Sequence, residues 1–204
     1  DAASSVCDSE TTTMVEVLDV TSKLDAAIET YWIANATEDN PLDRSDFIEN
    51  PSFEDYTNGW DVINMGRQTN TVFTLKKGTY YLEKWADRGK KIPNASVSQI
   101  IKDLPKGRYK LIASALHIQQ TGSGSTINSG NPQTGATLYA GMNEVPVTAM
   151  AQYTVNFSVV GEKEDVEIGL KAVNPTGNFL CVDNFRLQYV GGISSVDCIA
   201  EMKH

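Results

Sequence analysis

The histidines and carboxylates of this chain narrow the chemistry that it can perform. Histidine occurs only at His117 and at the final residue, His204. A Ser-His-acid site therefore has one internal base to draw on, and no G-x-S-x-G turn accompanies it. A glycosidase needs two carboxylates across a groove, and Glu83 and Asp87 in "YLEKWADR" could form such a pair. We interpret them instead as a pair at a solvated strand end, so we expect no enzymatic activity.

A sugar-binding site needs other side chains. Aromatic rings stack on the apolar face of a pyranose, and a few polar groups bind its hydroxyls. Trp85 is the leading aromatic candidate, because the polar run "ADRGKK" follows it and places it at a rim; packing at the rim or in the core is the alternative. Trp60 is expected in the core. The candidate ligand-binding residues are Trp85, Tyr80, Tyr81, Tyr139, His117, Gln119 and Asn178.

The first element that the sequence predicts is an amphipathic helix over residues 11–36. Its apolar or small residues recur at steps of 3, 4, 3, 4 and 3 residues, at Met14, Val17, Thr21, Leu24, Ile28 and Tyr31. Threonines at 11–13 can cap its start, and "NATEDNPLD" ends it, because Pro41 cannot continue a helix. We expect this helix to dock on its own domain. The alternative is that it is the last helix of an upstream neighbouring domain.

From residue 47 the hydrophobic period changes to two, which is typical of half-buried antiparallel strands. The predicted strands cover residues 71–75, 79–85, 95–101, 108–118, 136–140, 153–160, 165–173 and 179–190. Turn signals lie at 104–108, 160–165 and 174–178, and 121–135 reads as a long polar loop. Many short strands without intervening helices predict an all-β sandwich or barrel. We expect Phe53, Trp60, Leu111, Phe157, Ile168, Phe185 and Leu187 in its core.

Three motifs in this region resemble parts of a known fold. "NPSFEDYTNGW" (50–60) is similar to the first motif of galactose-binding-like jelly rolls, especially carbohydrate-binding modules of families 4, 9 and 22. "SQIIKDLPKGRYKLIASA" (98–115) resembles their central hairpin, and "VDNFRLQY" (182–189) their closing strand. The resemblance implies an antiparallel jelly-roll β-sandwich over 47–190, with the helix and linker at 1–46 and a tail or linker at 191–204. Such modules occur in extracellular glycan-processing proteins of gut Gram-negative bacteria, and they are not catalytic.

The same resemblance implies a structural calcium site. In related jelly rolls the Glu of the first motif and the Asp of the last strand meet at a calcium ion, and the matching residues here are Glu54 and Asp183. Calcium prefers six to eight oxygen ligands, and by analogy a backbone carbonyl near 77–79 is the third. The alternative is that Glu54 caps a turn and Asp183 accepts from backbone amides.

Composition excludes several partners. The net charge of −9 disfavours binding to nucleic acids and to anionic membrane surfaces, and no apolar run approaches the ~20 residues of a membrane span.

Of the cysteines Cys7, Cys181 and Cys198, we expect Cys181 to be a small buried hydrophobic residue. A bridge between Cys7 and Cys198 stays open, because no pair has the spacing of a metal or redox motif.

Two functions remain. The first is a non-catalytic carbohydrate-binding module of an extracellular or cell-surface glycan-utilisation protein, with a periplasmic location as the alternative and a glycan or oligosaccharide as partner. The second is a structural or protein-interaction β-sandwich without a sugar site. An exposed stripe at Leu24, Ile28 and Tyr31 would favour the second. In either case we expect neighbouring domains in a longer parent chain.

Overall fold

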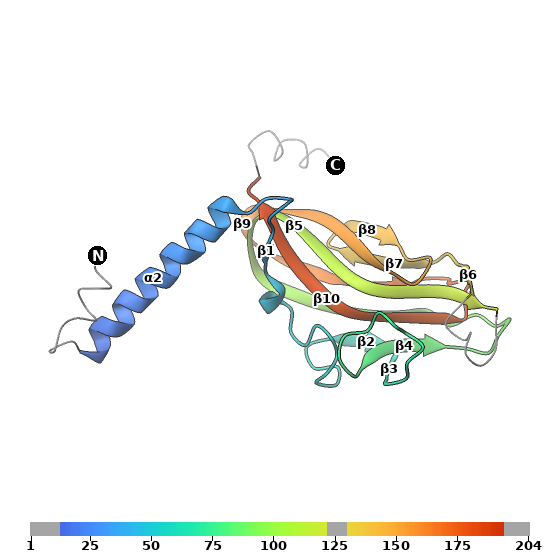
Figure 1. The fold of residues 1–204 in the computed structure, drawn as a ribbon. Coiled ribbons are helices and arrows are strands. Elements are labelled where there is room, and N and C mark those ends of the chain that lie inside the picture. The colour runs from blue at the N-terminus through green and yellow to red at the C-terminus, as the bar shows by residue number, and fades with distance from the viewer. Residues whose placement is uncertain (1–12, 122–129, 194–204) are drawn as a thin grey trace.

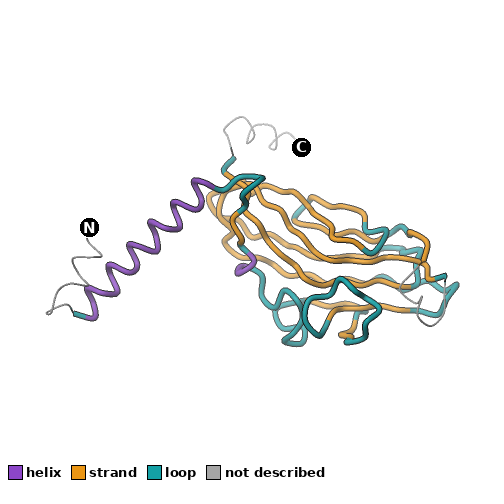
Figure 2. Tube along the Cα trace, viewed as in Figure 1, coloured by secondary structure: helices purple, strands orange, loops and turns teal. Residues whose placement is uncertain are grey.

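The structure is a computed structural model that describes residues 13–121 and 130–193. An antiparallel β-sandwich carries one helix, α2, at its N-terminal end, which confirms the predicted β-sandwich with a single N-terminal helix (Figures 1 and 2). The elements are α2 (Met14–Asn35), β1 (Leu42–Asp43), the 3-10 helix η1 (Ser45–Phe47), β2 (Asp61–Ile63), β3 (Gly66–Gln68), β4 (Tyr81–Trp85), β5 (Ala95–Gln120), β6 (Gly130–Pro132), β7 (Ala136–Ala140), β8 (Asn143–Pro146), β9 (Ala151–Ala172) and β10 (Phe179–Gly191).

Helix α2 begins and ends close to the predicted residues. The Thr13 hydroxyl accepts a hydrogen bond from the Glu16 amide at 3.3 Å, and the Glu16 carboxylate accepts from the Thr13 amide at 2.8 Å. This capping box satisfies two backbone donors that have no partner inside the helix. Ala36 has extended backbone angles and ends the helix.

The prediction that this helix docks on its own sandwich is wrong. None of its residues is buried, and Figure 1 shows it projecting from one end of the β-sandwich. Its attachment lies in the last two turns, where Ile33 packs against the core cluster and Glu29 forms an ion pair with Arg44. The periodicity predicted an apolar face correctly, but it could not show that this face would remain uncovered.

Strands β5 and β9 are each one long bent strand, where the sequence predicted two. They pair antiparallel from Ala95 opposite Ala172 to Ala115 opposite Ala151. The register shifts between Ile101 and Leu104 and again between Pro105 and Gly107. The predicted hairpin turn at 104–108, and its counterpart at 160–165, are therefore the bulged corner where both strands bend, since bulges increase local twist and bend.

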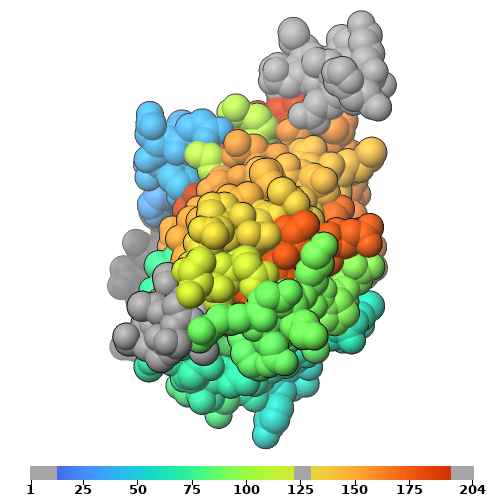
Figure 3. All heavy atoms as spheres, turned by 90° about the vertical axis from the view of Figure 1, so that its right-hand side faces the viewer, coloured from blue at the N-terminus to red at the C-terminus, as the bar shows by residue number. Residues whose placement is uncertain are grey.

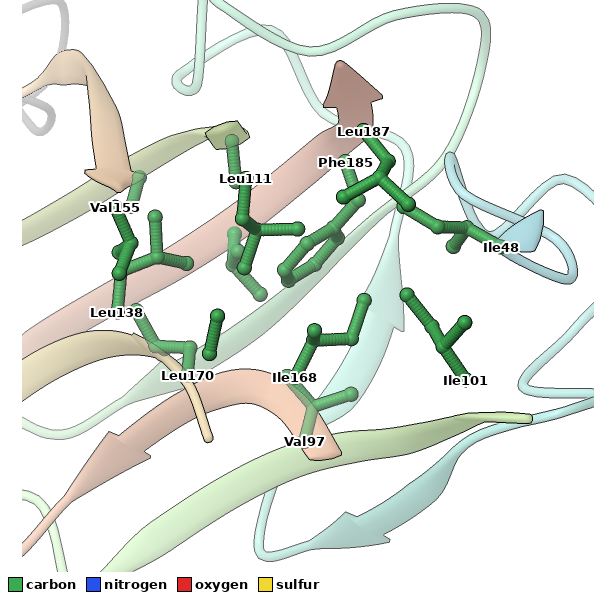
Figure 4. Packing of buried hydrophobic residues seen from close by; sticks show 14 of the residues in the cluster. Ile48, Val97, Ile101, Leu111, Leu138, Val155, Ile168, Leu170, Phe185 and Leu187 are labelled. Atoms are coloured by element: carbon green, nitrogen blue, oxygen red, sulfur yellow. The ribbon is translucent and has the colours of Figure 1, made fainter. Parts of the chain in front are cut away.

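This bend converts one hydrogen-bonded sheet into two facing layers. Its strand order is β3-β4-β10-β5-β9-β7-β8, with β1 on β10 and both β2 and β6 on β5. In Figure 4, Leu111 and Leu187 from one layer face Val97 and Ile168 from the other across the core. All seven predicted core residues are buried, and the five that lie in strands confirm which face of β5, β9 and β10 is buried.

Two predicted boundaries differ from the structure. Residues 71–75 form no strand, although Phe73 is fully buried, because this segment covers one face of the sheet as a loop. The sheet begins before residue 47, since Leu42 and Asp43 of β1 pair with Tyr189 and Gln188 of β10. Of the tail or linker predicted at 191–204, residue Gly191 belongs to β10 and residues 194–204 lie outside the described residues, as do Cys7, Cys198 and most of the loop at 121–135.

The packing makes a quantitative prediction at Phe157, which is 6% exposed and stacks on Tyr109 at 5.5 Å between ring centroids. Phe157→Ala should lower the free energy of unfolding by about 3–5 kcal/mol, because it leaves a cavity in the core. The control is Ile100→Ala on the outer face, where the side chain is 52% exposed and the expected cost is below about 1 kcal/mol. Urea unfolding measures both, and similar costs would contradict the assigned faces.

Candidate functional site

One layer of the sandwich carries a second hydrophobic cluster on its outer face. Tyr81 of β4, Phe179 and Cys181 of β10, and Leu116 and Ile118 of β5 form it together with Phe73. The segment 72–75 and Met150 pack over this cluster, so the sheet is covered on both sides here. Neighbouring strands place these side chains in rows, with Trp85 opposite Phe179 and Phe179 opposite Ile118. At the end of the rows the cover stops, and Trp85 is left 45% exposed.

A hollow of about 200 Å³ opens beside Trp85. Its lining consists of Asn70, Val72, Glu83, Trp85 and Phe179. Most of this lining is apolar, and the polar groups are one amide and one carboxyl. An aromatic wall with a few polar groups is the composition expected of a small-molecule site.

The Tyr81 hydroxyl orders the polar side of this hollow. It lies 2.7 Å from the Asn70 side-chain oxygen Oδ1 and 2.7 Å from the carboxyl oxygen Oε2 of Glu83. Burial raises the pKa of Tyr81 above its ordinary value, so its hydroxyl stays protonated and can donate. Burial also raises the pKa of Glu83, against the opposing effect of its hydrogen bonds to Tyr81 and Asn70. Glu83 and Asn70 are therefore fixed in place and face the same small volume as Trp85.

The Trp85 ring is held by a chain of amide hydrogen bonds. Its indole N–H donates to the Gln120 side-chain oxygen at 2.7 Å, and the Asn178 amide donates to the same oxygen at 3.0 Å. Asn178 also donates to the Ala86 carbonyl at 2.8 Å and accepts from the Gln120 backbone amide at 2.8 Å. Asn178 is buried, so it positions Trp85 and does not contact a ligand itself.

These bonds join three segments that are distant in sequence at the end of the sandwich remote from α2. The Ala86 amide donates to the Asn178 carbonyl at 2.8 Å, and the Asn178 amide donates to the Ile118 carbonyl at 3.1 Å. Figure 3 looks onto this end, where the green segment around 85–95 lies beside yellow-green and orange parts of the chain. The aromatic ring therefore stands on a rigid edge of the sheet.

The remaining predicted ligand residues lie elsewhere. His117 is completely buried on the core side of β5, against Gly177. The side-chain oxygen of Gln119 accepts a hydrogen bond from the Gly89 backbone amide, and its side-chain nitrogen donates to the Lys90 carbonyl, when the side-chain amide is oriented so that both groups are satisfied. Tyr139 lies on the other layer, where its hydroxyl donates to Glu167 at 2.7 Å.

Tyr80 stacks on the Arg67 guanidinium, whose central carbon is 3.4 Å from the ring centroid. The structure therefore brings Trp85 and Tyr81 together, with Asn178 behind them, and separates the rest. Sequence reasoning missed Asn70 and Gln120, and it assigned Glu83 to a solvated edge. The strand alternation of Tyr81, Glu83 and Trp85 could have indicated that Glu83 shares a face with the two aromatics.

The two predicted metal ligands meet at one loop. A Glu54 carboxylate oxygen accepts from the Thr79 and Tyr80 amides, both at 2.8 Å, and an Asp183 oxygen accepts from the Lys77 amide at 2.6 Å. Gly78 between them has φ +82°, and a Cβ there would lie 2.6 Å from the Glu54 oxygen. Glycine therefore lets the loop close around the carboxylate.

The Asp183 carboxyl group is buried close to Glu54, and both carboxylates accept hydrogen bonds from backbone amides. Burial, and in smaller part the negative charge of Glu54, raise the pKa of Asp183 to about 7, although the Lys77 and Asn184 amides oppose the shift. The other oxygen of Asp183 is buried and has no hydrogen-bond partner among the described residues. No cluster of three or more His, Cys, Asp or Glu side chains occurs in the described parts of the chain. A calcium ion here would hence need backbone or water oxygens besides Glu54 and Asp183.

No protein-family model matches the sequence, and no curated protein matches it significantly. Similar folds occur among solved structures. TmCBM61, solved in complex with β-1,4-galactotriose, aligns with a TM-score of 0.51 and 16% identity over 70% of this chain and 97% of that one. A cyclase from Fischerella sp. TAU aligns with a TM-score of 0.54 and 16% identity over 76% of this chain and 100% of that one.

A family 22 carbohydrate-binding module of Clostridium thermocellum Xyn10B aligns at a TM-score of 0.45 and 11% identity, over 75% of this chain and 99% of that one, which is too distant to support an argument. At these identities the likenesses concern the fold. The matches to TmCBM61 and to the cyclase confirm the β-sandwich fold, which a carbohydrate-binding module and an enzyme share. Among the described residues, no helix has the length and apolar character needed to cross a membrane.

The carboxylate pair predicts a response to calcium. An ion that binds only the folded state stabilises it by about 2.7 kcal/mol at a hundredfold excess over Kd. Chelator should lower the melting temperature, calcium should restore it, and Glu54→Gln or Asp183→Asn should abolish the response. Glu162→Gln, an exposed carboxylate far along the chain, is the control that should retain it. A melting temperature unaffected by chelator and calcium would contradict a calcium site.

His117 predicts a pH dependence. Burial lowers its pKa to about 4, against an ordinary value near 6.5. Between these values the unfolded chain binds a proton that the folded chain does not, so stability falls as the pH drops from 6.5 towards 4. His117→Met should remove up to about 2 kcal/mol of the stability difference between pH 7 and pH 5. Equal pH profiles for both proteins, measured by urea unfolding, would contradict a neutral buried His117.

Proposed function

We propose that this chain is a non-catalytic carbohydrate-binding module whose site is the hollow beside Trp85. The observation that carries the proposal is the exposed Trp85 ring, fixed by Gln120 and Asn178 next to Glu83 and Asn70. The flat face of an exposed tryptophan suits the apolar face of a pyranose. Glu83 and Asn70 would then bind the sugar hydroxyls.

The size of the hollow suggests what part of a glycan enters it. A volume of about 200 Å³ is below the ~300–1,000 Å³ typical of sites for larger ligands. It suits about one sugar ring, so we propose recognition of a terminal residue or a single ring within a chain. The galactotriose complex of TmCBM61 supports sugar binding on this fold, at the level of the fold alone.

The lining also supports a binding role over a catalytic one. Glycoside hydrolysis normally needs two carboxyl groups flanking the bond that breaks. Glu83 is the one carboxyl group in the described lining, and Asp87 is exposed beyond it. We therefore propose that Glu83 accepts hydrogen bonds from the ligand. A calcium ion at Glu54 and Asp183 would serve stability, and the proposed setting is an extracellular or cell-surface glycan-utilisation protein.

A second candidate function is protein interaction. The observation that favours it is the exposed apolar stripe of α2, which includes Leu24, Ile28 and Tyr31. Helix α2 projects from one end of the sandwich, and β4, which ends at Trp85, runs towards the other end (Figure 1), so both functions are compatible in one chain.

A glycan screen followed by isothermal titration tests the sugar proposal. Trp85→Ala should weaken binding of a glycan identified in the screen by roughly 10–100-fold, which is about 1.4–2.7 kcal/mol. Trp85→Phe should keep part of the affinity, because the stacking face remains, and Glu83→Gln should weaken binding without unfolding the protein. The control is Trp32→Ala, since Trp32 is 48% exposed but lies on α2.

Two outcomes would contradict the proposal in different ways. If Trp85→Ala binds as tightly as the unmodified chain, sugar binding is real but its site is elsewhere. If no glycan of a broad array binds the calcium-loaded protein, the protein-interaction function is left as the better account.

A further inference from the structure

Helix α2 displays apolar side chains to solvent in both its N-terminal and its C-terminal half. None of its 22 residues is buried. Its exposed large hydrophobic residues are Met14, Val15, Val17, Leu18, Leu24, Ile28, Tyr31 and Trp32. Single exposed hydrophobic residues are common, but several of them on one face of a helix mark an interaction surface.

The row has the spacing of a coiled-coil seam. Its members alternate at steps of three and four residues over about three heptads, at Met14, Val17, Thr21, Leu24, Ile28 and Tyr31. Such a repeat keeps one stripe facing a partner helix of the same repeat, and three heptads is about the shortest length that indicates a coiled coil. We define these six residues as the α2 seam.

The α2 seam faces away from the sandwich that carries it. The helix contacts its own domain through Glu29, which pairs with Arg44, and through Ile33, which packs against the core cluster. These two residues are four apart and share one face of the helix. At 3.6 residues per turn that face lies roughly opposite the seam positions Ile28 and Tyr31, so the sandwich does not obstruct a partner.

The charges of α2 are also kept off the seam. Glu16, Asp19, Lys23 and Glu29 lie on its other faces, and Lys23 pairs with Asp19 at 2.8 Å. Asp25 is the one charged residue at a flanking position, and in a parallel pair the heptad pattern places it beside Val20 of the second helix. Two copies therefore meet without opposed like charges, although the chain as a whole has a net charge of −9.

We propose that α2 pairs with α2 of a second copy of this chain to form a two-stranded coiled coil. The repeat is the same in both copies, the α2 seam contains no charged residue, and the sandwich of the same chain does not cover it. At 1.5 Å per residue the helix is about 33 Å long, so the contact is short and a micromolar affinity is expected. The pair carries two sandwiches and would present two hollows at once, which raises avidity for a multivalent glycan.

Sedimentation equilibrium of the full chain tests this under reducing conditions, which exclude disulfides through Cys7 and Cys198. The average mass should rise with concentration from 22.3 kDa towards twice that value. Leu24→Asp/Ile28→Asp should remain monomeric throughout. The control, Ser22→Asp/Thr30→Asp, adds the same charges to exposed positions outside the seam and should dimerise with a Kd within about threefold of the unmodified chain.

A second measurement needs no variant. Short isolated helices are only marginally stable in water, so dilution below the Kd should decrease the magnitude of the ellipticity at 222 nm as α2 frays.

An unmodified chain that stays monomeric at all concentrations would overturn the proposal. So would a dimer that survives the seam substitutions, a loss of dimer in both doubly substituted chains, or a trimer or tetramer in place of the dimer. None of these results depends on whether the hollow beside Trp85 binds sugar.

Discussion

The long antiparallel ladder between β5 and β9 is the contact on which the rest of the structure depends. It runs through both layers of the sandwich, from the pair Ala95 and Ala172 to the pair Ala115 and Ala151. Its bulged corner near Pro105 turns one sheet back on itself. The core exists because of that bend, since the two halves of the same strands face each other. The bend also separates two outer faces, and the face near the β5 C-terminus carries Trp85 and Glu83. Without the corner there would be neither a closed core nor an edge on which the amide chain of Gln120 and Asn178 could hold an aromatic ring.

Local sequence patterns predicted the strands and the core but not how the strands connect. Alternation at Val166, Ile168 and Leu170 identifies the buried face correctly, because it depends only on the two-residue period of a strand. Proline and glycine at 104–108 resemble a turn equally well when they form a bulge, so one bent strand was predicted as two. The helix shows the same limit. Its stripe predicts an apolar face, yet whether that face is covered depends on tertiary contacts that the stripe does not encode.

The candidate sites differ in predictability for a physical reason. Glu54 and Asp183 were identified as a pair from the motifs around them, and the loop at Gly78 brings both carboxylates to neighbouring amides. The hollow beside Trp85 depends on Asn70, which lies just before residues 71–75, a segment that was predicted as a strand and is found as a loop. Buried polar residues also mislead, because His117 and Asn178 look like ligand groups in sequence and lie inside the protein. Burial of a polar side chain is decided by the three-dimensional packing and not by its neighbours in the chain.

If a sugar ring stacks on Trp85, the indole N–H signals of the three tryptophans will report it directly in one spectrum. The Trp60 indole donates to the Glu49 carbonyl inside the protein, the Trp85 indole donates to Gln120 at the hollow, and Trp32 lies on α2. Titration with a glycan in a ¹H–¹⁵N correlation spectrum should shift the Trp85 indole signal saturably, together with the side-chain amides of Asn70 and Gln120. The signals of Trp60 and Trp32 should stay in place. Saturable shifts that leave Trp85 unmoved would contradict the account.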